Sequence, residues 1–364
     1  MKYYLIAGEA SGDLHGANLM RAILEKDADA EFRFWGGDKM ASVPKSTQVE
    51  HYKNTAFMGF VEVLKHLFTI FGLIKKCKAD LLAYQADVVI FIDYPGFNLR
   101  LAKFAKEAGL KTVYYISPQV WAWKESRVEK IKQYIDKMLV ILPFEKEFYK
   151  KHDYAVDFVG HPLLDALAEE NYALSYKSTK PIVALLPGSR KQEITTILPL
   201  FLSVEKYFPN HQFVIAGLTS IEDHVYQELI KDSQAQLVYN ETYALLQNSS
   251  VAMVASGTAT LETALFNVPM LVGYKSDFFS YHIGKYLVKV PYIALVNLIM
   301  GEKVVVELIQ GDLDEAHLKH ELKLLLEEDF RKQMQVKFQE LREKLGHSGA
   351  SEKAANLILD YIKL

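Results

Sequence analysis

The chain has very little cysteine: Cys77 is the single one among 364 residues. One cysteine cannot form a disulfide within the chain, and it cannot supply a metal cluster built from several thiolates. A disulfide-stabilised architecture is therefore excluded, and the composition favours a reducing compartment.

Net charge is also small. The chain carries 42 Lys and Arg against 45 Asp and Glu, a net charge of -3, which gives no electrostatic argument for nucleic-acid binding. The most apolar stretch, Leu67–Ile74, is too short to span a bilayer, which needs about 20 residues. The N-terminus, Met1–Gly8, leads directly into a predicted strand and lacks the longer apolar core and cleavage site of a signal peptide. We therefore expect a cytoplasmic protein.

Two familiar nucleotide-binding patterns are missing. The turn Gly8–Gly16 follows the predicted strand Tyr3–Ala7, but its glycine spacing is not G-x-G-x-x-G, and Asp13 in this turn would face a pyrophosphate. The turn Pro187–Arg190 lacks the G-K-[ST] of a P-loop. The first absence argues against a NAD-dependent oxidoreductase. The second excludes nucleoside-triphosphate hydrolysis by the P-loop mechanism.

What the sequence does contain is a repeated strand–turn–helix pattern. Buried apolar runs such as Asp87–Ile92 and Ile182–Leu186 are typical of parallel strands, and a glycine-containing turn and a helix follow each of them. The pattern restarts after Ala168–Lys180, a polar stretch without periodicity. Because a chain of 364 residues favours two domains, we predict an α/β fold. It has two Rossmann-like doubly wound domains facing a cleft, over residues 1–168 and 181–349.

Short polar side chains follow the first predicted strand. Ser11, Asp13 and His15 lie in the glycine-rich turn, and their side chains suit hydrogen bonds to sugar hydroxyls. Each of them is equally well explained as a turn-forming or capping residue. Both interpretations stay open at this point.

Two turns in the second half of the chain suit a bound diphosphate. The strand Val251–Ala255 leads through Ser256–Thr258 into a helix, whose first backbone N–H groups point outward and carry partial positive charge. The turn Pro187–Arg190 has the same setting, and the Arg190 guanidinium can bridge two phosphate oxygens. The alternative for Ser256–Thr258 is an ordinary helix capped by Ser or Thr.

Carboxylates near these turns suit the sugar part of a nucleotide. Glu262, one turn inside the helix, and Glu307 can each accept a hydrogen bond from a ribose hydroxyl. If the ligand is a nucleotide sugar, its diphosphate is the leaving group, and Arg190 with the two helix N-termini can meet the developing charge without a metal ion. The D-x-D spacing at Asp312–Asp314 occurs in metal-dependent glycosyltransferases, but its position at a helix start favours capping. We therefore expect no metal and no cofactor.

One acid lies where doubly wound sheets place their chemistry. Asp93 ends the buried strand Asp87–Ile92, at the carboxyl edge of the predicted sheet. It could instead cap the helix that follows from Leu99. Pro95 and Gly96 argue against capping, because they place a turn between the acid and the helix.

The segment Phe57–Lys78 is unusual. Leu67–Ile74 is apolar on nearly every helical face, and Lys75, Lys76 and Lys78 follow it. Such a helix suits a membrane interface or a pocket for acyl chains. The alternative is a helix buried in the core.

Seven segments, taken together and in order, resemble the lipid-A-disaccharide synthases and cover nearly the whole chain. Each is weak by itself, but the combination is highly specific. They are Gly8–Gly16, Asp93–Asn98, Ser117–Trp123, Val159–Leu163, Leu186–Arg190, Ser256–Glu262 and Leu295–Asn297.

The resemblance implies a GT-B glycosyltransferase fold, with the last helix, 350–364, packing back on the first domain. It implies transfer from UDP-2,3-diacylglucosamine to 2,3-diacylglucosamine 1-phosphate (lipid X), with inversion of the anomeric centre. The products would be UDP and a β-1,6-linked disaccharide 1-phosphate, an intermediate of lipid A. The first domain would bind the acceptor and the second the nucleotide sugar, with the protein peripheral to the inner face of the inner membrane. A homodimer is left open.

Carried over residue by residue, the resemblance implies that Asp93 is the general base and that Arg190 and Asn297 handle the donor. Two positions depart from the family: Gly96 replaces a second acid found in some members, and Val306 replaces a frequent proline before Glu307.

The residues expected at functional sites form three sets. The donor set is Gly188, Ser189, Arg190, Gly217, Ser256, Gly257, Thr258, Ala259, Thr260, Glu262, Asn297, Glu307 and Gln310. The acceptor-side set is Ser11, Asp13, His15, Asn98 and Trp121, and the membrane set is Leu67, Phe68, Ile70, Phe71, Leu73, Ile74, Lys75 and Lys76.

The main alternative is a non-hydrolysing UDP-N-acetylglucosamine 2-epimerase, which shares the two-domain scaffold. Such an isomerase has no lipid acceptor, so the apolar segment Phe57–Ile74 would have no purpose there. A catalytically silent lipid-binding protein is a further alternative, but it would not need Asp93 and Arg190 at the ends of strands.

Overall fold

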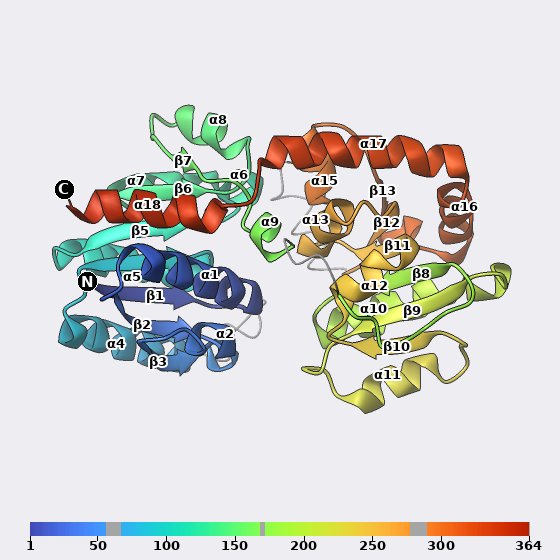
Figure 1. Cartoon of the computed structure of the whole chain (residues 1–364), viewed down its shortest axis with the longest axis horizontal. Coiled ribbons are helices and arrows are strands. Elements are labelled where there is room, and N and C mark those ends of the chain that lie inside the picture. The colour runs from blue at the N-terminus through green and yellow to red at the C-terminus, as the bar shows by residue number, and fades with distance from the viewer. Residues whose placement is uncertain (56–66, 168–171, 277–289, 364) are drawn as a thin grey trace. The chain divides into compact units, whose positions relative to one another are not determined.

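The computed structural model describes residues 1–55, 67–167, 172–276 and 290–363. The chain divides into two compact units (Figure 1). Unit 1 consists of Met1–Ala166 together with Leu345–Leu364, and unit 2 consists of Leu167–Lys344. Each unit is built around one parallel sheet, and each is described by itself below.

The sheet of unit 1 has the strand order β3-β2-β1-β4-β5-β6-β7, and its paired strands are all parallel. The central strands are continuous apolar runs, because helices cover both faces of such a sheet. The strands are β1 (Lys2–Ala7), β2 (Glu31–Gly36), β3 (Ser46–His51), β4 (Val88–Ile92), β5 (Lys111–Tyr115), β6 (Lys137–Val140) and β7 (Asp157–Phe158).

Helices follow most strands of unit 1, as expected for right-handed strand–helix–strand crossovers. They are α1 (Ala10–Lys26), α2 (Asp38–Ala41), α4 (Leu67–Tyr84), α5 (Pro95–Glu107), α6 (Val120–Trp123), α7 (Val128–Tyr134), α8 (Glu145–Lys150), α9 (Leu163–Ala166) and α18 (Ala350–Lys363), with short 3₁₀ turns η1 (Tyr52–Asn54) and η2 (Glu125–Arg127).

The sheet of unit 2 is again parallel, with the order β10-β9-β8-β11-β12-β13. Its strands are β8 (Ile182–Leu186), β9 (Gln212–Gly217), β10 (Gln236–Tyr239), β11 (Ser249–Ala255), β12 (Met270–Tyr274) and β13 (Val306–Ile309). Its helices are α10 (Lys191–Leu202), α11 (Asp223–Ile230), α12 (Thr242–Gln247), α13 (Thr258–Leu265), α15 (Leu295–Met300), α16 (Glu315–Leu325) and α17 (Glu328–Leu345), with 3₁₀ turns η3 (Glu205–Tyr207) and η4 (Gln310–Asp312).

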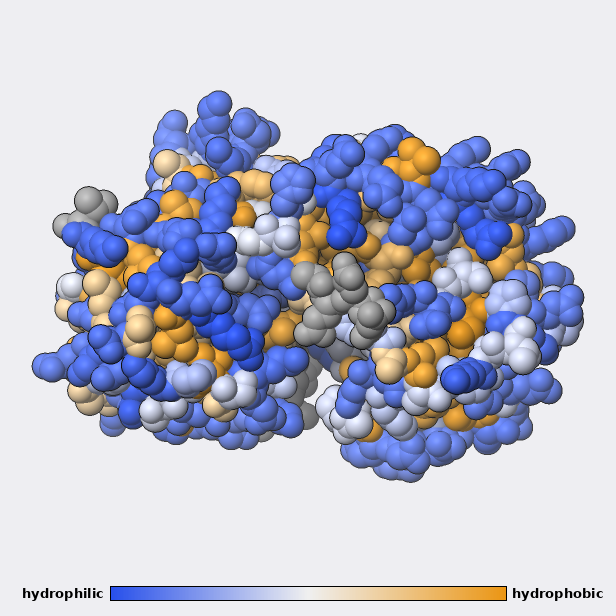
Figure 2. Space-filling view, viewed as in Figure 1, coloured by the Kyte–Doolittle hydropathy of each residue, from blue (hydrophilic) through white to orange (hydrophobic). Residues whose placement is uncertain are grey.

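The predicted α/β fold with two doubly wound parallel sheets is confirmed. Hydrophilic residues dominate the visible surface (Figure 2), while the strand side chains form the cores. The sequence missed β3, whose polar residues form an edge strand. The C-terminal part of the chain is helical, and α16, α17 and α18 are separated at Leu326–Glu327 and at Gly346–Gly349.

The strand orders place a topological switch point in each sheet. In unit 1 it lies between β1 and β4, and in unit 2 between β8 and β11, because the chain winds outward in opposite directions from these neighbouring strands. Ligands of doubly wound sheets bind outside the carboxyl ends of strands at such points. Asp93 follows β4, and the turns that contain Arg190 and Ser256 follow β8 and β11.

The last helix, α18, packs against α1 in unit 1 (Figure 1). Asp165 fixes its start: the carboxylate accepts hydrogen bonds from the backbone N–H groups of Gly349, Ala350 and Ser351 at 2.5, 3.2 and 2.9 Å. A carboxylate at a helix N-terminus satisfies N–H groups that have no partner within the helix. The segment that leaves unit 1 is thus bonded to the segment that re-enters it.

In the described part of the chain, no helix combines the length and the apolar character needed to cross a membrane.

Candidate active site

The backbone after β4 is strained where Asp93 lies. Asp93 and Tyr94 have φ angles of 42° and 50°, in the left-handed region that costs side-chain-bearing residues about 1–3 kcal/mol each. Tyr114 Oη and Asn98 Nδ2 both donate hydrogen bonds to the Asp93 carbonyl oxygen, the latter at 2.8 Å. Two buried side chains therefore hold the acid in this conformation.

Burial changes the acidity of Asp93. Desolvation, with a smaller contribution from the charge of Glu9, raises the pKa of Asp93 to about 7. A carboxylate with such a pKa is a much stronger proton acceptor than an exposed aspartate, and it is still largely ionised just above neutral pH. The geometry and the pKa together make Asp93 a candidate general base.

Glu9 was not among the predicted site residues. It precedes α1 at the carboxyl end of β1, and β1 pairs directly with β4. The adjacency of these strands at the switch point brings the two acids together, and this adjacency is not visible in the linear sequence. Neighbouring Gly8 lies under the ring of Tyr94, since a Cβ at Gly8 would be 2.2 Å from Tyr94 Cγ.

Two predicted acceptor-side residues bond to the backbone of the chain itself. The buried carboxylate of Asp13 accepts hydrogen bonds from the N–H groups of Gly37, Lys39 and Met40, at 2.7–3.1 Å. Asn98, fully buried, also donates to the carbonyls of Ile6 and Ile92, in addition to that of Asp93. These contacts are structural, because a buried polar group needs such partners. The acceptor-side assignment of Asp13 and Asn98 stays a prediction beside this structural role.

The other acceptor-side residues are more dispersed. Ser11 is exposed in the first turn of α1. Burial lowers the pKa of His15 to about 4, so the imidazole is neutral at physiological pH. Trp121 is half-buried and packs edge-on against Phe144.

In unit 2, a carboxylate already contacts the turn expected to bind a diphosphate. Glu193 Oε2 accepts a hydrogen bond from Ser189 N at 3.0 Å, and Glu193 Oε1 pairs with Arg190 Nη1 at 3.1 Å. Gly188 has φ 117°, and a Cβ there would lie 2.6 Å from Glu193 Oε2. The N–H and guanidinium donors of this turn therefore converge on one anionic group. Sequence patterns did not identify Glu193.

The second phosphate-type turn leads into α13. Ser256 Oγ donates to the carbonyl of Ile293 at 3.2 Å, and Thr260 Oγ1 donates back to the carbonyl of Gly257 at 2.8 Å. The N-cap residue of α13, Gly257, has no side chain that could bond the first N–H groups of the helix, and an uncapped helix N-terminus suits an acceptor group on a ligand. Glu262 lies one turn further in, and burial raises its pKa to about 7.

Glu307, which is half-buried, and Asn297, which is buried, form one hydrogen-bonded unit. The Glu307 carboxylate accepts hydrogen bonds from Ile293 N, Ala294 N and Asn297 Nδ2, the last at 2.8 Å. Asn297 Oδ1 in turn accepts from Val304 N and Val305 N. The two side chains hold the loop that Ser256 also contacts. Their polar atoms have partners within the chain, which supports a role in shaping the donor site, and the expectation that they handle the donor stays a prediction.

The remaining donor residues have separate settings. Gln310 Nε2 donates to Ser276, at 3.3 Å to its carbonyl and 3.1 Å to its hydroxyl. Gly217 ends β9, where Leu237 and Tyr239 leave no room for a Cβ. The expected capping role in the D-x-D segment is confirmed, since Asp314 Oδ1 accepts from His317 N at 2.9 Å. Among residues that the structure describes, no cluster of three or more His, Cys, Asp or Glu side chains could hold a metal ion.

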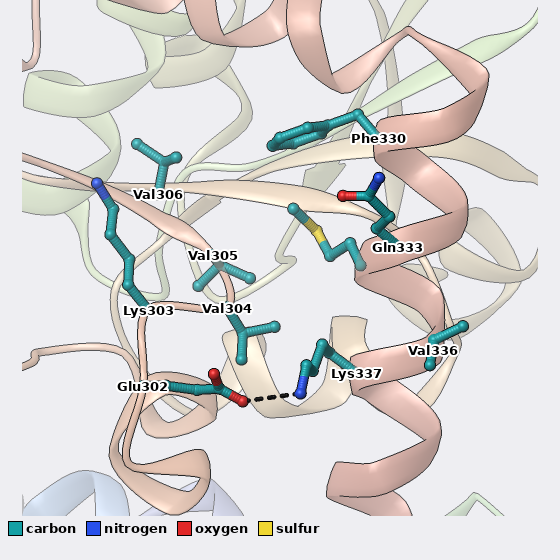
Figure 3. A pocket seen from close by; sticks show the side chains of 10 residues that line it. Glu302, Lys303, Val304, Val305, Val306, Phe330, Gln333, Val336 and Lys337 are labelled. Atoms are coloured by element: carbon teal, nitrogen blue, oxygen red, sulfur yellow. Dashed lines mark ion pairs between the residues drawn. The ribbon is translucent and has the colours of Figure 1, made fainter.

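A pocket of about 500 Å³ lies elsewhere in unit 2, between the residues around the start of β13 and α17 (Figure 3). Its lining includes Val304, Val306 and Phe330, and a 3.0 Å ion pair joins Lys337 to Glu302. None of the predicted donor residues lines this pocket. We therefore do not assign the donor to it.

Helix α4 has two different faces. Ile70 and Ile74 are buried, at 9% and 8% exposure, in the core of unit 1, whereas Phe68 and Phe71 are 93% and 61% exposed. This corrects the membrane set: both isoleucines are core residues, and Leu73 also packs against the core. Segment 57–66 and the Leu67 side chain lie outside the described residues.

The two lysines of the membrane set are both exposed, and Lys76 also pairs with Glu50 at 2.7 Å.

The fold defines a class of protein. Across almost all of its length the chain resembles a glycosyltransferase of kitacinnamycin, with a TM-score of 0.68, 13% identity and 99% of each chain covered. It also resembles an S. aureus MnaA–UDP structure, with a TM-score of 0.70 and 15% identity over 100% of this chain and 97% of that one. UDP-N-acetylglucosamine 2-epimerases are further neighbours, such as that of Neisseria meningitidis. The chain therefore has the GT-B fold that glycosyltransferases share with these epimerases.

Sequence similarity decides between the two activities. The family model described as lipid-A-disaccharide synthetase matches residues 3–360. The lipid-A-disaccharide synthase of Trichlorobacter lovleyi is 37% identical over 99% of this chain and 97% of its own length. That of Syntrophus aciditrophicus is 39% identical with the same coverage. The chain belongs to the lipid-A-disaccharide synthase family, and it is a glycosyltransferase of lipid A biosynthesis.

Proposed function

We propose that the chain transfers 2,3-diacylglucosamine from UDP to 2,3-diacylglucosamine 1-phosphate, with inversion, and releases UDP. Family membership supports this reaction. The structural observation that carries it is Asp93, a half-buried acid at the switch point of unit 1 with its pKa raised to about 7. We assign the acceptor to unit 1 and the nucleotide sugar to unit 2.

Asp93 acts as the base in this proposal. Its carboxylate takes the proton of the acceptor 6′-hydroxyl as the oxygen attacks the anomeric carbon of the donor. The bond from that carbon to the UDP oxygen breaks on the opposite face, and its electron pair leaves with UDP. The hydrogen bonds from Tyr114 and Asn98 hold the backbone of the base in place, which limits the reorganisation needed during the reaction.

Arg190 and the turn before α10 receive the diphosphate. The Glu193 carboxylate contacts the donor groups of Ser189 and Arg190, which supports an anionic ligand at that place. Positive charge there stabilises the UDP leaving group as its charge develops. The N-terminus of α13 contributes further N–H donors, and Glu262 binds the ribose.

Membrane contact is part of the proposal because both substrates carry acyl chains. Phe68 and Phe71 expose aromatic rings on one face of α4, and Lys75 is exposed one turn later. Aromatic and cationic side chains on one helical face suit the interface of an anionic bilayer. We propose a peripheral contact through this face, at the inner surface of the inner membrane.

The test is turnover with both purified lipid substrates, following UDP release and disaccharide formation, with and without chelator. We expect stoichiometric UDP and disaccharide, a β-linked product by NMR, and the same rate with chelator. UDP release without disaccharide, or conversion of the donor to its 2-epimer, would contradict the proposal.

A further inference from the structure

Tyr94 has a conformation that its place in the fold does not favour. It is the N-cap residue of α5, with φ 50° and ψ 56° in the left-handed region. Helix N-caps are usually Ser, Thr, Asp or Asn in an extended conformation, and their side chains bond the first N–H groups of the helix. The Tyr94 hydroxyl instead donates a hydrogen bond to the carbonyl of Thr55 in another loop. A strained residue persists only where its surroundings hold it, and such residues are concentrated at functional sites.

Three contacts from different parts of unit 1 fix the side chain of Tyr94. The ring lies over Gly8, in the turn after β1, where a Cβ would be 2.2, 2.4 and 2.6 Å from the ring atoms Cγ, Cδ1 and Cδ2. It stacks on buried Phe97, with ring centroids 5.6 Å apart and an interplanar angle of 29°. The third contact is the hydrogen bond to Thr55, a buried residue that follows β3 and η1. The side chain therefore connects the loops that follow β1, β3 and β4.

The glycine at position 8 is explained by this ring. Gly8 is buried, and its φ angle lies outside the left-handed region that favours glycine. Its backbone conformation therefore does not require glycine. The three atoms nearest to a Cβ at this position all belong to the ring of Tyr94. A side chain at residue 8 would have to displace that ring.

The peptide bond between Asp93 and Tyr94 is held from both sides. The Asp93 carbonyl accepts hydrogen bonds from Tyr114 and Asn98, and the contacts of the ring fix the residue that follows. Asp93 and Tyr94 both have left-handed φ angles, 42° and 50°. Because backbone dihedral angles determine which side-chain rotamers are allowed, a change of backbone at Tyr94 would also redirect the Asp93 carboxylate.

We propose that Tyr94 is a positioning residue for the general base, whose ring, packed on Gly8 and bonded to Thr55, keeps the Asp93 carboxylate directed toward the acceptor hydroxyl. This inference rests on the proposed function, in which Asp93 takes the proton of that hydroxyl. Tyr94 transfers no proton itself and acts through the backbone next to the base. Misplacing a reacting group by about 1 Å can lower a rate by about a hundredfold. Loss of the ring contacts should therefore lower kcat rather than the affinity for either substrate.

The first experiment measures turnover of the full chain with both lipid substrates in three variants. Tyr94→Phe removes only the bond to Thr55, and kcat should fall about fivefold, as for the loss of one neutral hydrogen bond. Tyr94→Ala removes the ring, and Gly8→Ala displaces it, so each should lower kcat by about a hundredfold. The KM of the acceptor and the UDP affinity should stay within about twofold, since only the reacting group is misplaced.

A double-mutant cycle tests whether Gly8→Ala acts through the ring. In the Tyr94→Ala background the ring atoms that the new Cβ would meet are absent, so adding Gly8→Ala should lower kcat no further. Losses that multiply instead would show that the two positions act independently. That result would overturn the assignment.

The Asp93→Asn background distinguishes this inference from the proposed function. If Tyr94 acts through the base, adding Tyr94→Ala to Asp93→Asn should not lower the residual turnover further. A further loss would contradict positioning. Near-normal turnover in Asp93→Asn alone would contradict the proposed function. A low rate in Asp93→Asn with a normal kcat in folded Tyr94→Ala would contradict only the role of Tyr94.

The pH profile gives a readout that a loss of stability alone would not change. Desolvation, with a contribution from the charge of Glu9, raises the pKa of Asp93, and a backbone hydrogen bond from Tyr94 opposes the rise. A carboxylate that is no longer held in its half-buried position is better solvated, so in Tyr94→Ala the midpoint of kcat/KM should move below about 7. An unchanged midpoint would contradict the assignment.

Tyr154→Phe is the matched control. Tyr154 is half-buried, and its hydroxyl donates to the carbonyl of Ile135 at 2.9 Å, just before β6 and so at the opposite edge of the sheet from Asp93. This variant loses the same kind of bond as Tyr94→Phe, and it should keep a normal kcat. Equal losses of kcat in the two variants would mean that the effect is general. Melting temperatures show whether each variant is folded, and Tyr94→Phe keeps the test decisive if Tyr94→Ala is not.

Discussion

The two units place side chains of different character at the same topological position, the switch point of the sheet. At the switch point of unit 1, Asp93 is half-buried and partly desolvated, and its carbonyl is held by Tyr114 and Asn98. At the switch point of unit 2, Ser189 and Arg190 are exposed and contact a carboxylate, Glu193, on the same turn. A base gains strength from desolvation, whereas a diphosphate site needs accessible donors that can exchange one anion for another.

The two sites also depend on different features of the fold. Unit 1 uses two consecutive left-handed residues and a buried hydrogen-bond network to fix one carboxylate. Unit 2 instead uses backbone N–H groups at the starts of α10 and α13, which any strand–turn–helix unit supplies. The first arrangement depends on particular side chains, and the second depends mainly on topology. The five predictions below follow from this difference and from the two faces of α4, in decreasing order of expected effect.

The largest effect is expected for Asp93→Asn, which keeps the shape of the side chain and removes the base. Turnover should fall by about a hundredfold or more, because general-base catalysis is lost. UDP affinity should not change, since the donor is assigned to unit 2. Steady-state kinetics with calorimetry checks both statements. A folded variant with near-normal turnover would remove Asp93 from its role.

The donor side should respond in binding as well as in rate. Arg190→Ala should weaken UDP affinity by about tenfold or more, since charge-assisted hydrogen bonds to phosphate are lost. Arg190→Lys should recover part of this loss, because lysine restores the charge but not the bidentate geometry. Calorimetric titration with UDP measures both variants. Unchanged affinity in Arg190→Ala would place the diphosphate elsewhere.

The pH profile separates the desolvated base from an ordinary acid. Because the pKa of Asp93 is raised to about 7, kcat/KM should rise with pH through that value and then level off. The rate at pH 6 should be about tenfold below the plateau, since only the ionised form accepts a proton. A profile that is flat from pH 5 to 8 would show that this ionisation does not control the rate.

The same pKa shift makes a prediction for stability. An acid whose pKa is higher in the folded state than in the unfolded state destabilises the fold as pH rises from the unfolded value, near 3.8, through about 7. Asp93→Asn should therefore raise the melting temperature at pH 8 and change it little at pH 4. Equal shifts at both pH values would indicate a structural effect of the substitution instead.

The smallest effect concerns the two faces of α4. Phe68→Ser with Phe71→Ser should reduce binding to anionic vesicles severalfold and leave the melting temperature nearly unchanged, because both rings are exposed. Ile70→Ser with Ile74→Ser is the matched comparison, and it should destabilise unit 1, since each large-to-small core change costs about 2–5 kcal/mol. Co-sedimentation and thermal melting separate the two pairs. A collapsed melting temperature in the phenylalanine pair would contradict the membrane assignment.

Much of the architecture could be predicted because parallel strands are apolar over their whole length. The runs that became β4, β8 and β11 were recognised in this way, and the turns after them contain Asp93 and Arg190. The two faces of α4 were not predicted because the apolar window was shorter than the helix. In the window Leu67–Ile74 every face is apolar. Over the whole helix, the buried residues Ile70, Ile74, Cys77 and Leu81 form one stripe at helical spacing.

Side-chain partners were the part that the sequence could not provide. Glu9 approaches Asp93 only because β1 and β4 are neighbours, and Tyr114 reaches the Asp93 carbonyl from β5. The partners of Asp13 and Glu307 could not be predicted for the same reason, since their carboxylates bond backbone N–H groups that are distant in sequence. Residue type and position within a motif indicate that a polar group needs a partner, but the tertiary fold decides which partner it has.

The bond from Asp165 to the start of α18 has a consequence for the order in which the protein is made. Unit 2 is inserted in sequence between two parts of unit 1. On the ribosome, residues 167–344 emerge completely before the helix that covers α1 is available. Although domains often fold from the N-terminus during synthesis, the unit that begins first here is completed last. Until then the surface of α1 is not covered by α18, and the Asp165 carboxylate lacks the N–H groups at the start of that helix. A nascent chain stalled before residue 345 would expose both to chaperones.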